Sequence, residues 1–248
     1  KSTFHFYPKA EAKYSFHDIF VPYIGIDGEK TRNSFRSLSK ENPFILSDVN
    51  LQNTNTKYNV YAGIRGSISN SVSFNLQASR KKIYAMPLYF NDTTFSIQNK
   101  MDVLYDSLDE TSFMAQVAYQ QGEKLRVYLK GEYKFYSPLN QKHVWNKPAL
   151  DITLSGIYDL ADKILVRMDV YFIGDRKAKS LTDVEGSTFE SGSYTVNQKA
   201  FVDFNLGLEY RYSKRVSAFL NFNNIISKLN NNNIHSLIRD YIYSIYIN

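Results

Sequence analysis

The residue types that most often carry chemistry are sparse in this chain and poorly spaced for it. The four histidines are far apart in the sequence and stand at positions His5, His17, His143 and His235. No two of them have the i, i+4 spacing with which histidines on one helix face bind zinc. The chain also has no cysteine, which excludes disulfides and thiolate metal sites. We therefore predict no metal site.

One acidic cluster, formed by Asp106, Asp109 and Glu110, has the composition of a calcium site or of a glycosidase carboxylate pair. It lies in a long alternating segment, and we interpret it as a solvated part of an extended strand. Neither a G-x-x-x-x-G-K phosphate loop nor a G-x-S-x-G nucleophile turn occurs. We therefore expect no catalytic residue, no bound cofactor and no enzymatic activity.

The elements that contain these residues alternate with period two, which indicates strands with two different faces. Between 125 and 136, apolar residues such as Leu129 alternate with polar ones such as Lys130. The same separation recurs in the ranges 58–68, 72–79, 163–172 and 202–222. No comparable helical period appears before the last twenty or so residues. The chain is therefore predicted to be all-β.

The connections between these strands alternate in length. Short turns are expected at His17-Asp18, 69–71, 122–124, 160–162 and Ser213-Lys214. Long polar connections are expected between them, around 29–56, 91–100, 137–147 and 175–199. Outer-membrane barrels have this rhythm, with short periplasmic turns and long extracellular loops. A sandwich or a Greek key has no reason to keep it.

The predicted strands are long enough to span a membrane. We expect about ten antiparallel strands, most of them near or above the ~9–11 residues that cross a bilayer at a tilt. Some are longer, notably 101–121, and would rise above the membrane. No segment approaches the ~20 consecutive apolar residues of a membrane-spanning helix. The pattern predicts an antiparallel up-and-down transmembrane β-barrel.

The composition agrees with strands that meet lipid. Aromatic residues make up 15% of the chain, with 20 Tyr and 17 Phe, and only 22% of the residues are charged. Residues such as Tyr133, Phe135, Tyr210 and Tyr212 end the apolar faces where an interfacial girdle would lie. The alternative explanation is that strands in general favour Tyr and Phe. The net charge of +6 comes from scattered Lys and Arg, so we expect no nucleic-acid partner.

The stretch 200–224, AFVDFNLGLEYRYSKRVSAFLNFNN, resembles the penultimate hairpin of TonB-dependent-receptor-like barrels from Bacteroidetes. In that family a strand of the form D-x-N-L-G-x-E-Y-R turns on a basic pair into x-S-A-F-L-x-x-N-N. The pieces LSGIYDL at 154–160 and VYFIG at 170–174 also resemble its strands. The resemblance covers most of 57–228.

This resemblance implies an outer-membrane barrel whose full-length members carry a plug and import ligands with energy from the inner membrane. The chain shows no plug and too few strands for that barrel, so residues 1–228 would be its C-terminal portion, a partial barrel. The expected partners are outer-membrane lipid, an unidentified small ligand at the extracellular loops, and TonB acting through the missing plug. The expected location is the cell outer membrane.

After Lys228 the sequence departs from the family, whose members continue into a last strand that ends in Phe. Residues 229–248 are therefore predicted to be an atypical C-terminal tail, which a shifted reading frame or a truncation would produce. Two alternatives remain for the whole chain. One is a small stand-alone outer-membrane barrel with a structural or adhesive role, since about ten strands can close by themselves. The other is a soluble β-sandwich that binds carbohydrate through exposed Tyr, Phe and Trp145.

Overall fold

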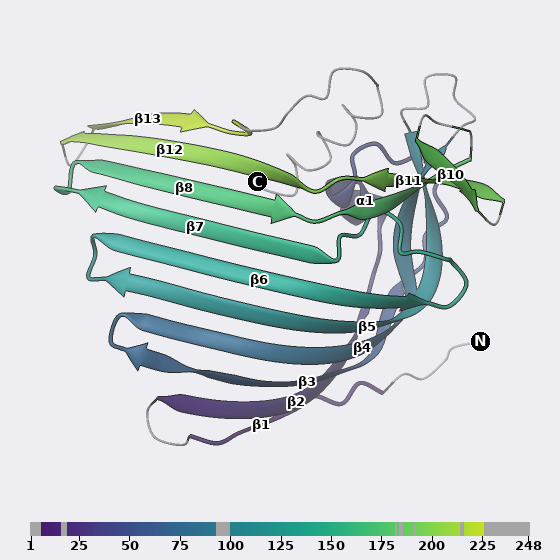
Figure 1. Ribbon diagram of the computed structural model, residues 1–248, viewed down its shortest axis with the longest axis horizontal. Coiled ribbons are helices and arrows are strands. Elements are labelled where there is room, and N and C mark those ends of the chain that lie inside the picture. Colours follow the sequence, from purple (N-terminus) through teal and green to yellow (C-terminus); the bar gives the residue numbers. More distant parts are fainter. Residues whose placement is uncertain are drawn as a thin grey trace.

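One antiparallel sheet of ten strands dominates the computed structural model (Figure 1). The structure describes residues 6–15, 19–92, 100–181, 183, 186–190, 192–213 and 216–225. The strands of the sheet are β1 (Ala10–Lys13), β2 (Phe20–Thr31), β3 (Thr54–Ser69), β4 (Val72–Asp92), β5 (Lys100–Gln121), β6 (Leu125–Pro138), β7 (Leu150–Leu160), β8 (Ile164–Ile173), β12 (Phe201–Ser213) and β13 (Val216–Phe222). Each strand pairs with the one before it in this order, so the prediction of an all-β, up-and-down antiparallel fold is confirmed.

The two faces of this sheet differ in chemistry, and the apolar face is the more exposed one. On β3 and β4 the alternating residues Val60, Ile64 and Leu76 are 41%, 45% and 50% exposed. Ser79 on the opposite face is only 6% exposed. We call the first the apolar face and the second the polar face. Soluble proteins bury their apolar side chains, so this arrangement is the reverse of a sandwich core.

No second sheet covers the apolar face in the part of the chain that the structure describes, and β1 and β13 are the two edges of the sheet. The ten strands pair in one continuous sheet and not in two facing sheets, so the prediction of a β-sandwich as the alternative fold is wrong. In the described part of the chain, the curved sheet in Figure 1 is open between β1 and β13, as expected for a partial barrel. Among the described residues, no helix is long and apolar enough to cross a membrane.

The connections segregate to the two ends of the strands, as predicted. The short turns 70–71, 122–124 and 161–163 lie at the left end of the sheet in Figure 1. The long connections 32–53, 139–149 and 174–200 lie at the right end. The predicted turn at His17-Asp18, residue Lys214, most of 91–100 and the tail 229–248 lie outside the described residues.

Two of the long connections contain secondary structure that the sequence pattern did not predict. Helix α1 (Phe35–Glu41) begins at Ser34, whose side chain and that of Ser37 form a reciprocal capping box. Three short strands, β9 (Arg176–Ser180), β10 (Ser187–Glu190) and β11 (Ser193–Gln198), form a second sheet. The sequence analysis assigned these segments to long polar connections and identified neither the helix nor the three short strands.

Strands β4 and β5 extend beyond their neighbours as a two-stranded ribbon, as predicted for 101–121, and they are 21 and 22 residues long. A bulge interrupts β4 between Ile83 and Met86, where Ala85 has a positive φ of 54°. The bulge adds one residue to β4, so the side chains that follow it change faces. Leu88 therefore pairs with Leu104 on the polar-face side of the ribbon.

Candidate functional site

The long connections gather around the β4–β5 ribbon and form what we call the loop-end assembly, which comprises 32–53, 83–92, 100–110, 139–149 and β9–β11. Two small cores hold it together, one on each face of the ribbon. The core on the polar-face side contains Ile83, Leu88, Leu108, Val144 and Trp145. The core on the other side contains Leu38, Ile45, Tyr89 and Val103. Connection 139–149 thus packs on one face of the ribbon and connection 32–53 on the other.

Asp106 anchors connection 139–149 to the ribbon. Its side chain is 2% exposed. Its carboxylate accepts hydrogen bonds from the backbone N–H of Asn140 and Gln141, at 3.1 and 2.8 Å, and from the side-chain amide of Asn140 at 2.8 Å. The backbone N–H of Ser107 donates another, at 2.8 Å. Four donors satisfy the buried charge and fix the start of the connection.

The three carboxylates of the predicted acidic cluster do not come together. Strand alternation puts Asp109 on the face opposite to Asp106 and Glu110. Glu110 accepts from Lys81 at 3.0 Å on the polar face, whereas Asp109 lies 3.9 Å from both Arg80 and Lys82 on the apolar face. The interpretation of the cluster as solvated was wrong, because Asp106 and Glu110 are buried. No group of three potential metal ligands occurs among the described residues.

His143 lies at the junction of connection 139–149 with the small sheet. Its Nε2 is 3.4 Å from Oε2 of Glu190 and 3.2 Å from Nζ of Lys177. Lys142 Nζ lies 3.1 Å from the same Glu190 oxygen. The imidazole packs edge-on against Trp145, with ring centroids 5.4 Å apart. His143 and Glu190 therefore link two connections that are distant in the sequence.

The environment of this junction shifts two pKa values. Burial, reinforced by the positive charge of Lys177, lowers the pKa of His143 below its ordinary value of 6.5. A hydrogen bond from Lys142 lowers the pKa of Glu190 below its ordinary 4.5. At neutral pH the imidazole is accordingly neutral and the carboxylate is charged. The other three histidines lie outside the described residues.

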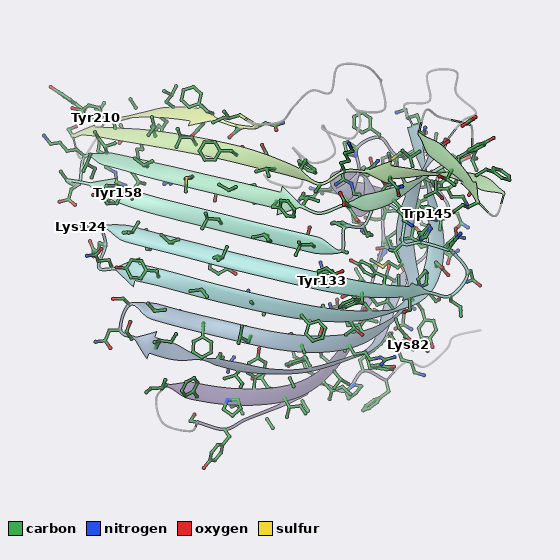
Figure 2. All side chains as sticks on the ribbon, viewed as in Figure 1. Lys82, Lys124, Tyr133, Trp145, Tyr158 and Tyr210 are labelled. Carbon is green, nitrogen blue, oxygen red and sulfur yellow. The ribbon has the colours of Figure 1, made fainter. Side chains whose placement is uncertain are left out.

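Trp145 is buried, contrary to its expected role as an exposed carbohydrate contact in the sandwich alternative. It is 2% exposed, and its indole N–H donates to Oε1 of Gln141 at 3.0 Å. Figure 2 shows it at the loop end of the molecule, away from the short turns. Lys179 of β9 lies over both the Trp145 ring and the Phe90 ring, with its Nζ 6.0 and 5.7 Å from their centroids.

The loop-end assembly therefore presents cations next to aromatic rings. Its basic residues on the polar-face side include Lys142, Lys177 and Lys179, of which Lys142 and Lys177 are exposed. This set can attract and hydrogen-bond an anionic small molecule. Sequence reasoning did not single out these lysines. The alternation in Arg176–Ser180, which puts Lys177 and Lys179 on one face of a strand, was the available signal.

Below the loop-end assembly, the polar face is covered by hydrogen-bonding and ionic side chains. Lys134 lies 3.6 Å from Glu132 and 3.5 Å from Asp151, and Tyr23 donates to Asn75 at 2.7 Å. Further ion pairs on this face join Arg65 to Glu11, Lys130 to Glu132, Arg167 to Glu209, and Arg211 to Asp159 and Glu209. This is the chemistry expected of a wall that faces a polar lumen.

The apolar face ends in exposed aromatic side chains at two levels. Tyr158 and Tyr210 lie towards the short turns, and Tyr133 lies towards the loop end (Figure 2). Along β6, Tyr133 is eight residues from Leu125, the register partner of Tyr158. Eight residues correspond to about 27 Å of strand. The apolar band of an outer-membrane barrel is ~25 Å tall and is bordered by such aromatic girdles.

Comparisons with known proteins find this fold among solved structures only. No protein-family model matches the chain. No curated protein matches it either. Solved structures do match, although they have only 11–16% sequence identity to the chain. A likeness at this level of identity concerns the fold.

Three of these structures represent the set. The first is the pyoverdine outer membrane receptor FpvA from Pseudomonas aeruginosa bound to pyoverdine, with a TM-score of 0.62 and 15% identity over 90% of this chain. The second is the ferric-catecholate import receptor Fiu from E. coli K12, with a TM-score of 0.55 and 15% identity over 88% of this chain. The third is the iron transporter FrpB from Neisseria meningitidis, with a TM-score of 0.55 and 11% identity over 89%.

This chain spans only about a third of the length of these proteins, at 32%, 30% and 33% respectively. The chain therefore has the fold of one part of the β-barrel of TonB-dependent outer-membrane receptors.

Proposed function

We propose that this chain is the C-terminal barrel portion of a TonB-dependent-type receptor or transporter in the cell outer membrane. The observation that carries the proposal is the reversed exposure of the two faces of the sheet. Phe113 and Leu129 on the apolar face are 52% and 43% exposed, and Ser112 on the polar face is 5% exposed. Such an apolar surface is stable against hydrocarbon, whereas in water it would promote aggregation.

The segregation of the connections supports an orientation. Short turns are typical of the periplasmic end of a barrel and long connections of the extracellular end. The loop-end assembly would then face the outside of the cell, and the turns 70–71, 122–124 and 161–163 would face the periplasm. Residues 229–248 would be the atypical C-terminal tail.

The proposed activity is binding and passage of an unidentified small ligand, without catalysis. Pyoverdine occupies one of the matched receptors, and another is an import receptor for ferric catecholates. The cations Lys142, Lys177 and Lys179 favour an anionic ligand at the loop-end assembly of this chain. The polar face would form one side of the route inward, and TonB would act through a plug that lies outside these 248 residues.

Cysteine labelling tests the location and orientation, because the chain contains no native cysteine. Three single variants report on three environments: Arg36→Cys on α1, Glu123→Cys in a short turn and Leu129→Cys on the apolar face. Intact cells are treated with a membrane-impermeant maleimide, before and after the outer membrane is permeabilised. We expect Arg36→Cys to react in intact cells and Glu123→Cys to react only after permeabilisation.

Leu129→Cys is the control for the lipid-facing surface, and it should react in neither condition, only after denaturation. If Leu129→Cys reacts as fast as Arg36→Cys in intact cells, the apolar face meets water and the membrane location is wrong. If Glu123→Cys reacts before permeabilisation and Arg36→Cys does not, the orientation is reversed.

A further inference from the structure

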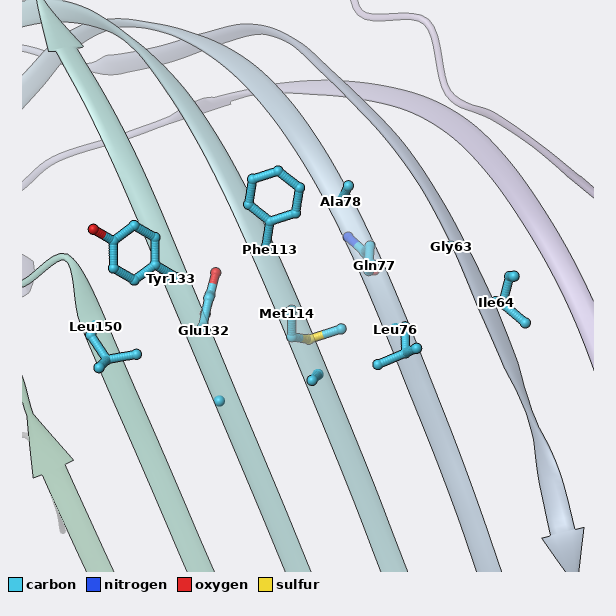
Figure 3. Close-up of a pocket in the computed structure, with 12 residues that line it drawn as sticks. Gly63, Ile64, Leu76, Gln77, Ala78, Phe113, Met114, Glu132, Tyr133 and Leu150 are labelled. Carbon is cyan, nitrogen blue, oxygen red and sulfur yellow. The ribbon is translucent and has the colours of Figure 1, made fainter.

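A shallow groove crosses the apolar face of the sheet over strands β3 to β7 (Figure 3). Its volume is about 550 Å³, within the ~300–1,000 Å³ of sites that hold small molecules. Small side chains form its floor, because Ala115 and Gly131 are register partners on β5 and β6. Phe113 and Tyr133, the next pair towards the loop end, border it there, and Leu76 borders it on β4.

The groove has a positively charged end. Ala78, one of its lining residues, is followed on the same face of β4 by Arg80 and then Lys82. Arg80 therefore lies about 7 Å further along the strand towards the loop end. The side chains of Arg80 and Lys82 are 66% and 39% exposed. Both side chains lie 3.9 Å from the carboxylate of Asp109, so two cations share this one carboxylate and leave an excess of positive charge.

This end of the groove coincides with the loop-end aromatic border of the apolar face. Phe113, Tyr133 and Phe135 pack against one another there, with ring centroids 6.2 and 4.7 Å apart. Aromatic side chains of this kind lie at the level where hydrocarbon meets lipid head groups. Long basic side chains at that level place their charges among the head groups, where they bind phosphate.

We propose that the groove and the Arg80–Lys82 pair together bind one anionic phospholipid, with an acyl chain in the groove and the phosphate on the two cations. The inference rests on the proposed membrane location. It adds a specific site to a surface that otherwise contacts lipid without selection. Charge complementarity favours this occupant over a second copy of the chain, because a purely apolar contact would leave Arg80 and Lys82 facing hydrocarbon.

Two variants separate the two halves of the site. Arg80→Gln with Lys82→Gln removes the charges, and Gly131→Leu fills the floor of the groove. A Cβ at Gly131 would have Ile152 Cγ1, at 4.0 Å, as its nearest neighbour, so the larger side chain enters the groove without a backbone clash. The matched controls are Lys124→Gln with Lys163→Gln, exposed lysines at the short-turn end, and Ala218→Leu on the apolar face of β13, remote from the groove.

Native mass spectrometry of the full-length detergent-solubilised protein measures binding of added phosphatidylglycerol, with phosphatidylcholine as the zwitterionic comparison. We expect one phosphatidylglycerol to bind at least fivefold more tightly than phosphatidylcholine. The charge variant should lose this preference, Gly131→Leu should weaken binding of both lipids at this site at least fivefold, and both controls should behave as the unmodified protein.

An unchanged preference in the charge variant, or unchanged binding in Gly131→Leu, overturns the proposal. A mass of two chains that Gly131→Leu disrupts would identify a second copy as the occupant and overturn it as well. The labelling of Leu129→Cys reports on the membrane location independently. If that residue is protected and the lipid preference is absent, the lipid site is wrong and the proposed function stands.

Discussion

At the scale of single residues, Asp106 and His143 control how connection 139–149 sits on the ribbon. Asp106 accepts four hydrogen bonds in a buried position, and His143 joins the connection to the small sheet. Trp145, the only tryptophan of the chain, is buried in the same connection, where it contacts His143 and donates a hydrogen bond to Gln141. Its fluorescence therefore reports whether the connection is docked.

Asp106→Asn should loosen this docking. The substitution removes the charge and replaces one acceptor oxygen with an NH₂ group that faces backbone N–H donors. The loss of charged hydrogen bonds at a buried site costs about 2–3 kcal/mol. We expect a red shift of Trp145 emission and faster hydrogen exchange in 139–149. Asp162→Asn, in an exposed turn with a positive φ that asparagine tolerates, should leave both unchanged; an equal shift in that control would contradict the anchoring role of Asp106.

Acidification should undock the connection through His143. The pKa of His143 is lowered in the docked state, so the undocked state binds a proton first as the pH falls through 6.5. The stabilisation is complete above pH 6.5 and decreases below it. Glu190 has a lowered pKa, so its contribution is lost only below about pH 4.5. A titration of Trp145 emission should show the first transition in the unmodified chain and not in His143→Gln; an identical titration in this variant would exclude the imidazole as its source.

At this scale, the separation of the three carboxylates could be predicted from the sequence. Alternation along β5 separates Asp109 from Asp106 and Glu110, so a three-carboxylate site could have been rejected from spacing alone. The burial of Trp145 and the meeting of His143 with Glu190 could not be predicted. Both depend on how two connections fold back on the ribbon, and no local pattern encodes that contact.

At the scale of elements, regular alternation predicted the sheet, and irregular positions escaped prediction. Strands β3 to β8, β12 and β13 of the large sheet follow from period two because each has one apolar and one polar face. Helix α1 has seven residues, too few to show a helical period. Strands β9–β11 have four to six residues each and a polar composition typical of loops. The extra residue at the Ala85 bulge moves the later side chains of β4 to the opposite face. Simple alternation along the sequence would therefore assign Leu88 to the wrong face of the sheet.

Deletion of Ala85 should reverse that inversion. Without the extra residue, Leu88 would turn to the apolar-face side and leave the core that holds Trp145. The expected results are a red shift of Trp145 emission and the loss of at least about 2 kcal/mol, as for a large apolar side chain withdrawn from a core. Ala85→Gly keeps the bulge and suits the positive φ, so it should be as stable as the unmodified chain or more so. Normal emission after the deletion would show that the bulge does not set the register of the ribbon.

At the scale of the whole molecule, the two faces of the sheet favour different surroundings: the apolar face favours hydrocarbon and the polar face favours water. The sequence predicted this from alternation and from the rhythm of the connections, and the exposed apolar face agrees with it. The loop-end assembly and the charged end of the groove were not predicted, because they depend on the relative positions of several strands.

Two adjacent residues of β7 allow a matched test of whether the apolar face meets lipid and the polar face meets water. Leu154 lies on the apolar face and Ser155 on the polar face, where Asp169 is its register partner. In lipid vesicles, Leu154→Lys should lower the free energy of unfolding by about 2–4 kcal/mol. Ser155→Lys should change it by less than about 1 kcal/mol, because the new ammonium group meets a carboxylate. Urea unfolding by Trp145 emission measures both, and equal effects would mean that both faces meet water.

The exposed apolar face also bears on the time before the chain reaches its membrane. In an aqueous compartment, strands as long as β4 and β5 with one apolar face invite strand addition by other copies. The charges of the polar face do not protect the backbone donors and acceptors along the edges of the sheet. For the proposed outer-membrane protein we therefore expect transport in an unfolded state, bound to a chaperone that covers its tyrosines, phenylalanines and leucines. The yield of inserted protein then depends on the relative rates of membrane insertion and self-association. Substitutions on the apolar face would change these rates, and therefore the yield, even where they leave the properties of the inserted barrel unchanged.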